Sequence, residues 1–220
     1  MKLSPRNPER SGLAFTRTEL CFALIGLFVV GILILPLFAR CSCKAVRINC
    51  VNNLKQVALA FRIWSGDNGD LYPMAILTNQ HGGPLYANTD SMIRYFQVMS
   101  NELSTPKVLI CPAEIERYPA TNFGTGFANQ HASYFIGLEA DENRPNMFLS
   151  GDRTLDNGNL MNNGTMLLSS NQNLFWQPKK IHRGNGDVAM TDGSVSQLDN
   201  SRLKNAVART GIGVTYLVFP

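Results

Sequence analysis

His182 and Asp192 are the two residues of this sequence whose types and spacing could do chemistry together. Nine residues separate them in the segment HRGNGDVAMTD, and Gly193 follows the aspartate. An imidazole and a carboxylate can form an acid–base dyad or supply two ligands to a metal ion. Two ligands are too few for a structural zinc site, and the sequence has no HExxH motif and no paired CxxC motifs. We therefore favour a structural role for His182, as a hydrogen-bonding link between a hairpin and a sheet, and expect no metal site and no cofactor.

The residues around Asp192 and Gly193 predict that hairpin. Two short β-prone runs, 187–191 and 194–198, flank the pair. Asp-Gly between strands favours a two-residue type I′ turn, in which both central residues have positive φ. A membrane-tethered hydrolase that uses His182 and Asp192 stays as a rival hypothesis.

No other motif indicates a catalytic site. The segment DNGD at 67–70 resembles a fragment of a calcium loop, but it lacks the alternating ligands and distal glutamate of an EF-hand, so we interpret it as a helix-terminating turn. The sequence contains no Gly-x-Ser-x-Gly, P-loop or dinucleotide-binding motif. His81 and His131 stand alone, and we assign them no role. We therefore expect a protein that is not an enzyme.

The five cysteines are too few for a disulfide scaffold. In an oxidising compartment Cys50 and Cys111 could pair where a helix meets a sheet. Cys50 is equally suited to be a small buried residue of that helix, so both interpretations stay open. Cys21, Cys41 and Cys43 lie within or just after an apolar run, and an odd total leaves at least one thiol without an intramolecular partner.

The apolar run itself covers residues 20–38, which are nineteen residues without a formal charge. As a helix it would be about 28 Å long, close to the roughly 30 Å hydrocarbon core of a bilayer. A cleaved signal peptide has a shorter apolar region with small residues at the cut, whereas this run ends in FARC. We therefore predict one retained membrane-spanning helix over residues 20–38.

Charge is distributed unevenly about this run. Residues 1–62 carry nine Lys and Arg against two acidic residues, whereas residues 63–220 carry eleven against fourteen. The larger part is thus slightly acidic, which argues against general nucleic-acid binding. Four basic residues precede the run in a short segment, and the positive-inside rule then places the N-terminus in the cytoplasm. We expect a single-pass inner-membrane protein with a periplasmic, extracytoplasmic C-terminal domain.

The N-terminal segment AFTRTEL at 14–20 resembles the processing site of type IV pilins and type II secretion pseudopilins. In that pattern a small residue precedes the cut, Phe is the first residue after it, and Glu is the fifth. This chain differs in having Ala14 where Gly is commoner, and polar residues at positions 17 and 18, where the family usually has apolar ones. The resemblance implies that a prepilin peptidase cuts after Ala14 and that the new amine of Phe15 is methylated. It also implies that Glu19 pairs with the N-terminal amine of a neighbouring subunit during assembly.

Beyond the run, apolar residues recur at the spacing of one face of an amphipathic helix: Cys50, Leu54, Val57, Phe61 and Trp64. The other face carries basic residues, among them Arg47 and Arg62, and helix-stopping residues follow at 65–70. We predict one long helix over 15–64, with a break near 41–43 left open. The segment 50–73, LICP at 109–112, SYFIGL at 133–138 and the His182 motif resemble a large bacterial group of pilin-like proteins named for that motif.

The rest of the chain predicts short strands and long turns, because residues 65–180 are rich in Asn, Gly and Pro. We expect strands within 107–111, 133–138 and 165–168, a loop over 141–164, a helix over 201–209 and a last strand over 214–219. The fold class is then α+β and pilin-like, with a long N-terminal helix packed on a small, mostly antiparallel sheet with long loops. Its parts are a basic leader (1–14), the helix (15–64) and an extracytoplasmic domain (65–220) with a hairpin at 187–198.

These features favour a structural subunit of a pseudopilus or pilus-like assembly of the type II secretion kind. The resemblance implies as partners the membrane, other copies or related pilin-like subunits, and a prepilin peptidase. The alternative is an uncleaved, membrane-anchored binding module whose loops within 65–180 recognise a ligand or an envelope partner. The first hypothesis predicts a cleaved N-terminus and self-association, whereas the binding module predicts an uncut N-terminus and no self-association.

Overall fold

The computed structural model describes residues 16–79, 89–158, 164–178, 180–211 and 213–220. The chain divides into two compact units, Met1–Lys44 and Ala45–Pro220. The helices are α1 (Arg17–Asp67), α2 (Pro73–Asn79), α3 (Thr89–Val98), α4 (Ser100–Leu103) and α5 (Asn200–Arg209), with two 3-10 turns, η1 (Pro106–Leu109) and η2 (Asn129–His131). The strands are β1 (Tyr134–Gly137), β2 (Phe148–Asp152), β3 (Leu155–Asp156), β4 (Thr165–Leu168), β5 (Phe175–Trp176), β6 (Asn185–Met190), β7 (Val195–Asp199) and β8 (Thr215–Val218).

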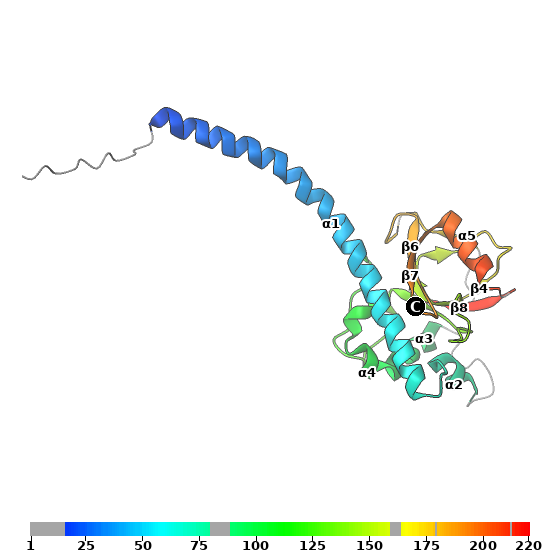
Figure 1. Cartoon of the computed structure of the whole chain (residues 1–220). Helices are drawn as coiled ribbons and strands as arrows, with labels where there is room; N and C mark the ends of the chain where they lie inside the picture. The colour runs from blue at the N-terminus through cyan, green and yellow to red at the C-terminus, as the bar shows by residue number, and fades with distance from the viewer. Residues whose placement is uncertain (1–15, 80–88, 159–163, 179, 212) are drawn as a thin grey trace, which may run out of the picture. The chain divides into compact units, whose positions relative to one another are not determined.

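Six of these strands form an antiparallel sheet in the order β4-β8-β1-β2-β6-β7, while β3 and β5 pair separately (Figure 1). Successive residues of a strand face opposite sides, so the sheet builds two cores. Tyr134 and Ala189 belong to the core that contains the domain part of α1, whereas Phe135 and Val188 belong to the core that contains α5. The prediction of an α+β fold with a mostly antiparallel sheet is confirmed at this level.

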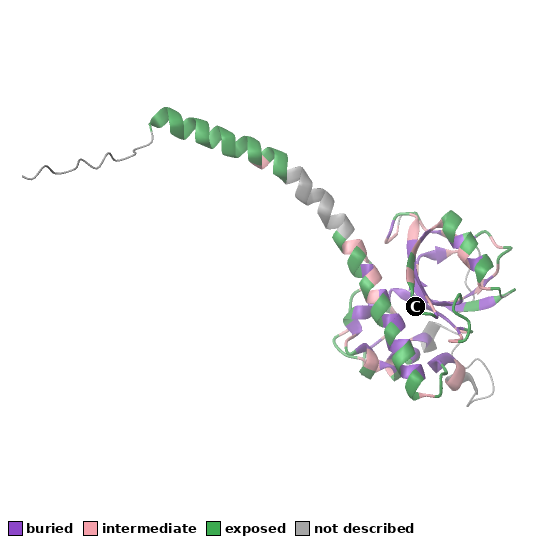
Figure 2. Ribbon diagram, viewed as in Figure 1, coloured by how far each residue is buried: buried purple, intermediate pink, exposed green. Residues whose placement is uncertain are grey.

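The domain part of α1 buries the face that the sequence pattern predicts. Its five apolar residues at helical spacing are all buried: Cys50, Leu54, Val57, Phe61 and Trp64 (Figure 2). The ring of Phe61 meets the rings of Tyr72 and Phe96 edge-on, with centroids 6.0 and 6.4 Å away. Each large side chain removed from water in this way contributes roughly 1.5–3 kcal/mol to folding. This face holds the helix on the domain.

The N-terminal unit contains one helical window, Arg17–Ile34, that is long and apolar enough to cross a membrane, with a mean hydropathy of 2.1. None of this window is buried, and Figure 2 shows it exposed. The last part of the predicted span 20–38 has side chains outside the described residues.

Several predictions for the middle of the chain are wrong. The run 107–111 forms η1 instead of a strand, because Pro106 occupies its first turn and the Thr105 side chain caps it by accepting from the Lys107 N–H at 3.4 Å. The segment 141–164, expected as a loop, contains the central strand β2, and helices α2 to α4 lie where short strands were expected. By contrast β1, β4, α5 and β8 lie where the sequence predicts them.

A disulfide joins Cys50 of α1 to Cys111, two residues after the end of η1, across a sequence separation of 61. It ties the buried face of the helix to the segment beside the sheet. Asn53, one turn further along α1, adds a hydrogen bond from Nδ2 to the Ile110 carbonyl at 2.9 Å.

We expect the double change Cys50→Ala and Cys111→Ala to lower the free energy of unfolding by about 4 kcal/mol, because an open loop of this length gains chain entropy when unfolded. Denaturant titration of the detergent-solubilised chain, followed by tryptophan fluorescence, measures the loss. Cys21→Ala is the control, since Cys21 is exposed and unpaired. A double variant as stable as this control would contradict the expectation.

Candidate functional site

A row of polar side chains crosses the α1-facing side of the sheet. Directly paired residues of antiparallel strands place their side chains on the same face. Tyr134 of β1 pairs with Asp152 of β2, and Asp187 of β6 pairs with Gln197 of β7. The register between β2 and β6 extends to bring the two aspartates opposite each other, and the Asp187 N–H donates to Asp152 Oδ2 at 2.8 Å. Four neighbouring strands therefore each supply one polar residue at the same level.

His182 reaches this row from the segment just before β6. Arg183 and Gly184 both have positive φ, 52° and 81°, so the chain turns sharply between the histidine and the strand. Glycine accepts this conformation freely, whereas it costs arginine about 1–2 kcal/mol. His182 Nε2 lies 3.5 Å from Asp152 Oδ2 and 3.5 Å from Asp187 Oδ2. We call Asp152, His182 and Asp187 the buried His–Asp cluster, since their side chains are 0%, 3% and 0% exposed.

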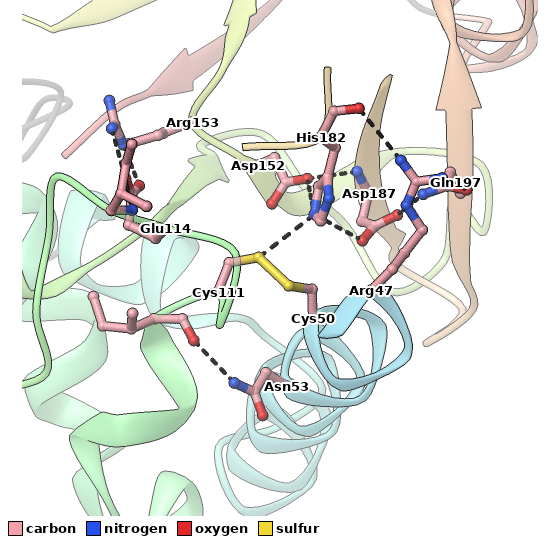
Figure 3. Close-up of a disulfide and its surroundings, with 12 residues drawn as sticks. Arg47, Cys50, Asn53, Cys111, Glu114, Asp152, Arg153, His182, Asp187 and Gln197 are labelled. Carbon is pink, nitrogen blue, oxygen red and sulfur yellow. Dashed lines mark hydrogen bonds and ion pairs between the residues drawn. A yellow bond between two sulfur atoms is a disulfide. The ribbon is translucent and has the colours of Figure 1, made fainter. Parts of the chain in front are cut away.

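Helix α1 and its disulfide cover the cluster (Figure 3). Cys111 Sγ lies 3.4 Å from His182 Nε2. Arg47 donates to Gln197 Oε1 at 3.2 Å and to the His182 carbonyl at 3.3 Å. The sequence analysis assigns Arg47 to the helix face other than the apolar one, and this is wrong: the residue is half-buried because both of its acceptors lie toward the sheet.

Burial shifts the pKa of each group of the cluster in the direction that favours the uncharged form. It raises the pKa of Asp187 to about 6. It also holds the pKa of Asp152 well above its usual range, and the neighbouring Asp187 carboxylate adds to this shift. Burial and the nearby Arg47 guanidinium lower the pKa of His182 to about 4. At neutral pH the imidazole is therefore uncharged and retains a nitrogen lone pair.

The cluster has donor atoms suited to a metal ion. One ligand atom from each of Asp152, His182 and Asp187 lies within 4.8 Å of the others, and the same holds for Cys50, Cys111 and His182. The two sulfurs of the second group are joined to each other, so they offer no thiolate. Imidazole nitrogen with carboxylate oxygen is a donor set of first-row transition metals. The expectation of no metal site counted only His182 and Asp192, whereas the fold places two other carboxylates, those of Asp152 and Asp187, beside His182.

Asp192 does not join His182. The histidine is buried just before β6, whereas Asp192 is exposed just after it, and its Oδ1 accepts the Ser194 N–H at 2.8 Å. The carboxylates beside the imidazole belong instead to Asp152 and Asp187. The dyad on which the rival hydrolase depends is therefore not formed.

Both ends of β6 are instead bound to α1. Arg47 donates to the His182 carbonyl, and Arg62 donates to the Asp192 carbonyl at 3.1 Å. The two arginines are about four helical turns apart along α1. The spacing of the motif thus places one contact with this helix just before β6 and the other just after it.

The hairpin predicted around Asp192-Gly193 is present between β6 and β7, but its turn differs from the prediction. The Gly193 N–H donates to the Met190 carbonyl at 2.9 Å, and the Met190 N–H donates to the Ser194 carbonyl at 2.8 Å. Only Gly193 of the pair has positive φ, 83°. The loop therefore has three residues, 191–193, with glycine at the left-handed position, instead of two residues in a type I′ turn.

The predicted N-terminal sites fall in the other unit. Glu19 is exposed in the first turn of α1, where its Oε2 accepts the Thr16 N–H at 2.9 Å. Ala14 and Phe15, the predicted cleavage and methylation sites, lie outside the described residues, as does His81.

Two further motifs have structural roles. The segment 67–70 ends α1, with Gly69 and Asp70 at positive φ and the Asp70 N–H bound to the Ser65 carbonyl at 2.9 Å. His131 is buried, and its Nδ1 accepts the Ala128 N–H at 3.0 Å. Neither segment contributes to the His–Asp cluster.

Comparison of the chain with protein-family models, with curated proteins and with solved structures found no match. What the His–Asp cluster can do is therefore inferred only from the contacts of its own residues.

Sequence reasoning missed both aspartates: Asp152 lies in a segment expected to be a loop, and Asp187 was only the first residue of a predicted strand. Alternation along β6, which puts Asp187 and the buried Ala189 on one face, was the one local signal that Asp187 points inward.

In metal-free buffer, we expect Asp187→Asn to gain stability relative to the wild type as pH rises from about 4 to 7. The pKa of this carboxyl is about 6 in the folded protein against 3.8 ordinarily, so ionising it costs more inside the fold than in the unfolded chain. The free-energy cost of ionising Asp187 in the folded protein is therefore absent below its ordinary pKa and fully present above pH 6. The shift of about two pKa units makes this cost about 3 kcal/mol.

Denaturant titration at several pH values measures this difference, with fluorescence from Trp64 and Trp176 in the domain. Asp192→Asn is the matched control, because it removes an exposed carboxylate from the same hairpin. A pH dependence for Asp187→Asn no larger than that of this control would contradict the expectation.

Proposed function

We propose that this protein is a pilin-like structural subunit that is anchored in a membrane by its N-terminal helix and assembles with copies of itself or related subunits. The observation that carries the proposal is the window Arg17–Ile34, an apolar helix with no buried residue and one carboxylate, Glu19, in its first turn. A helix that is apolar on all sides requires lipid or other helices around it.

The exposed side chains of this window cover every side of the helix: Leu20, Phe22, Leu24, Ile25, Leu27, Phe28, Val29, Val30, Ile32, Leu33 and Ile34. Lipid alone would satisfy them, so the carboxylate is what separates an assembling helix from a plain anchor. A carboxylate costs about 2.5–3.5 kcal/mol at bilayer depth on insertion scales, and less near the interface. The free amine of Phe15 in a neighbouring, cleaved subunit would neutralise it.

The domain part of α1 supports side-by-side packing as well. Ile48, Leu59 and Ile63 are each about half exposed and lie on one stripe of the helix, away from its buried face. Exposed apolar side chains in such a stripe are suited to contact with a neighbouring subunit. The same helix would then contribute contacts in the membrane and outside it.

Two features support an extracytoplasmic, non-enzymatic domain. Disulfides persist in oxidising compartments, and the Cys50–Cys111 bond closes the core of this domain. The His–Asp cluster is buried beneath α1, so no side chain of the cluster is presented to a substrate. In this proposal a prepilin peptidase cuts after Ala14 on the cytoplasmic side of an inner membrane, and the domain lies in the periplasm.

One observation favours binding as a second candidate function. A groove of about 380 Å³ lies between α5 and the β6–β7 hairpin, and Arg202, Arg209 and Asp192 are among its lining residues. A membrane-anchored binding module would use such a groove and would not need to self-associate.

We expect Glu19→Gln to abolish assembly while leaving the domain folded, because it removes the partner of the α-amine without touching the core. Assembly is measured by in vivo cross-linking and by recovery of filaments or oligomers from membranes. Domain folding is measured by its thermal unfolding in detergent.

Asp67→Asn is the matched control, since it removes an exposed carboxylate from the other end of the same helix. It should assemble like the wild type. Normal assembly of Glu19→Gln would overturn the proposed mechanism, and a wild type that stays monomeric in its native membrane would favour the binding module.

A further inference from the structure

His182 lies at distances from both carboxylates of the buried His–Asp cluster that fit a shared ion better than hydrogen bonds. His182 Nε2 is 3.5 Å from one oxygen of Asp152 and 3.5 Å from one oxygen of Asp187. Hydrogen bonds from nitrogen to oxygen are normally about 2.7–3.2 Å long. Donors that share a tetrahedral zinc ion, with bonds of about 2.0–2.1 Å, are about 3.3–3.4 Å apart.

The carboxylate oxygens of the cluster are only partly satisfied by the protein. Asp152 Oδ2 accepts the Asp187 N–H, and Asp187 Oδ1 accepts from Gln197 Nε2 at 3.3 Å. Asp152 Oδ1 and Asp187 Oδ2 are fully buried and have no hydrogen-bond partner among the described residues. A buried carboxylate oxygen without a partner is costly, because neither water nor protein stabilises its charge.

Arg47 and Arg153 favour the charged forms of these carboxyl groups only through space. The hydrogen bonds of Arg47 go to Gln197 and to the backbone of His182, and among the described residues neither aspartate of the cluster has an arginine or lysine ion pair. Tyr134, the β1 residue paired with Asp152, also has a buried hydroxyl without a hydrogen-bond partner in the described part of the chain. The row thus contains three unsatisfied oxygens next to one imidazole.

The ligands are held by rigid elements. The two aspartates come from β2 and β6 in the middle of the sheet, and the disulfide packs against the imidazole. Gln197 and the Asp187 N–H each bind one carboxylate oxygen, which is the kind of supporting contact that orients metal ligands. Little rearrangement would be needed to bring the three donors onto one ion.

We propose that Asp152, His182 and Asp187 bind one divalent transition-metal ion, with zinc as the best match, and that this ion fastens β2 and β6 to the segment before β6. One imidazole nitrogen with carboxylate oxygens suits zinc and its first-row neighbours. Calcium requires six to eight oxygen ligands and magnesium keeps several waters, neither of which suits a small buried site with one nitrogen donor. The disulfide sulfurs are not ligands, because oxidised sulfur is not a thiolate.

The test uses the full-length chain in detergent, with Cys21, Cys41 and Cys43 changed to Ser so that thiols outside the domain cannot bind the probe. After dialysis against EDTA, Zn²⁺ is titrated against a fluorescent chelator, and Co²⁺ absorption reports the ligand geometry. We expect one ion per chain, visible absorption bands from the bound Co²⁺, and a higher Tm with Zn²⁺ that Mg²⁺ and Ca²⁺ do not reproduce.

Asp187→Asn and Asp152→Asn keep the shape of each side chain but remove a ligand charge. Each should weaken Zn²⁺ binding by about 100-fold or more, because even the loss of a residue that only supports a ligand weakens metal binding by about 10- to 100-fold. Asp192→Asn is the matched control, and it should bind like the parent. Near-UV circular dichroism and the mass of the intact disulfide show that each protein is folded.

The proposal is overturned if the folded parent chain binds no Zn²⁺ at micromolar concentration. This outcome can be measured even if the cluster variants do not fold. It is also overturned if both aspartate variants bind as tightly as the parent, or if Asp192→Asn loses as much affinity as they do. In either of those cases the ion binds elsewhere.

Discussion

Two carboxylates held side by side without exposure to water are the constraint on which the domain depends. Transferring an ionised carboxylate into a low-dielectric interior is so unfavourable that the group must be paired, bound to a cation or protonated. Asp152 and Asp187 face each other across β2 and β6, and His182 lies over both of them. The raised pKa values of the two acids and the lowered pKa of the imidazole are direct consequences of this burial.

The elements around the cluster are arranged so that it stays closed. Helix α1 lies over it, joined by the disulfide on one side and by Arg47 on the other. Arg62 holds the far end of the same strand through the Asp192 carbonyl. The His-x9-Asp-Gly motif is thus better understood as a strand with a contact to α1 at each end than as two catalytic residues. Its histidine has a second role, toward the two aspartates, that the motif does not reveal.

The sequence predicts the elements whose signals are local. Helical spacing identifies the buried face of α1, and Asp-Gly identifies the hairpin, although its loop has three residues instead of the predicted two. Strand β2 could not be predicted in this way, because it is buried on both faces and so lacks alternation. Asp152 went unnoticed for that reason. Its contacts with His182 and Asp187 join residues about thirty positions apart, and no local pattern encodes them.

The proposed function depends on the other unit, where Glu19 bonds only to Thr16 among the described residues and the apolar helix is exposed. In the proposed mechanism, assembly through that helix requires a new N-terminus beside Glu19. The most direct test is the intact mass and N-terminal sequence of the protein purified from its native membrane. The proposed function predicts a chain that begins at N-methylated Phe15. A chain that still begins at Met1 would contradict it.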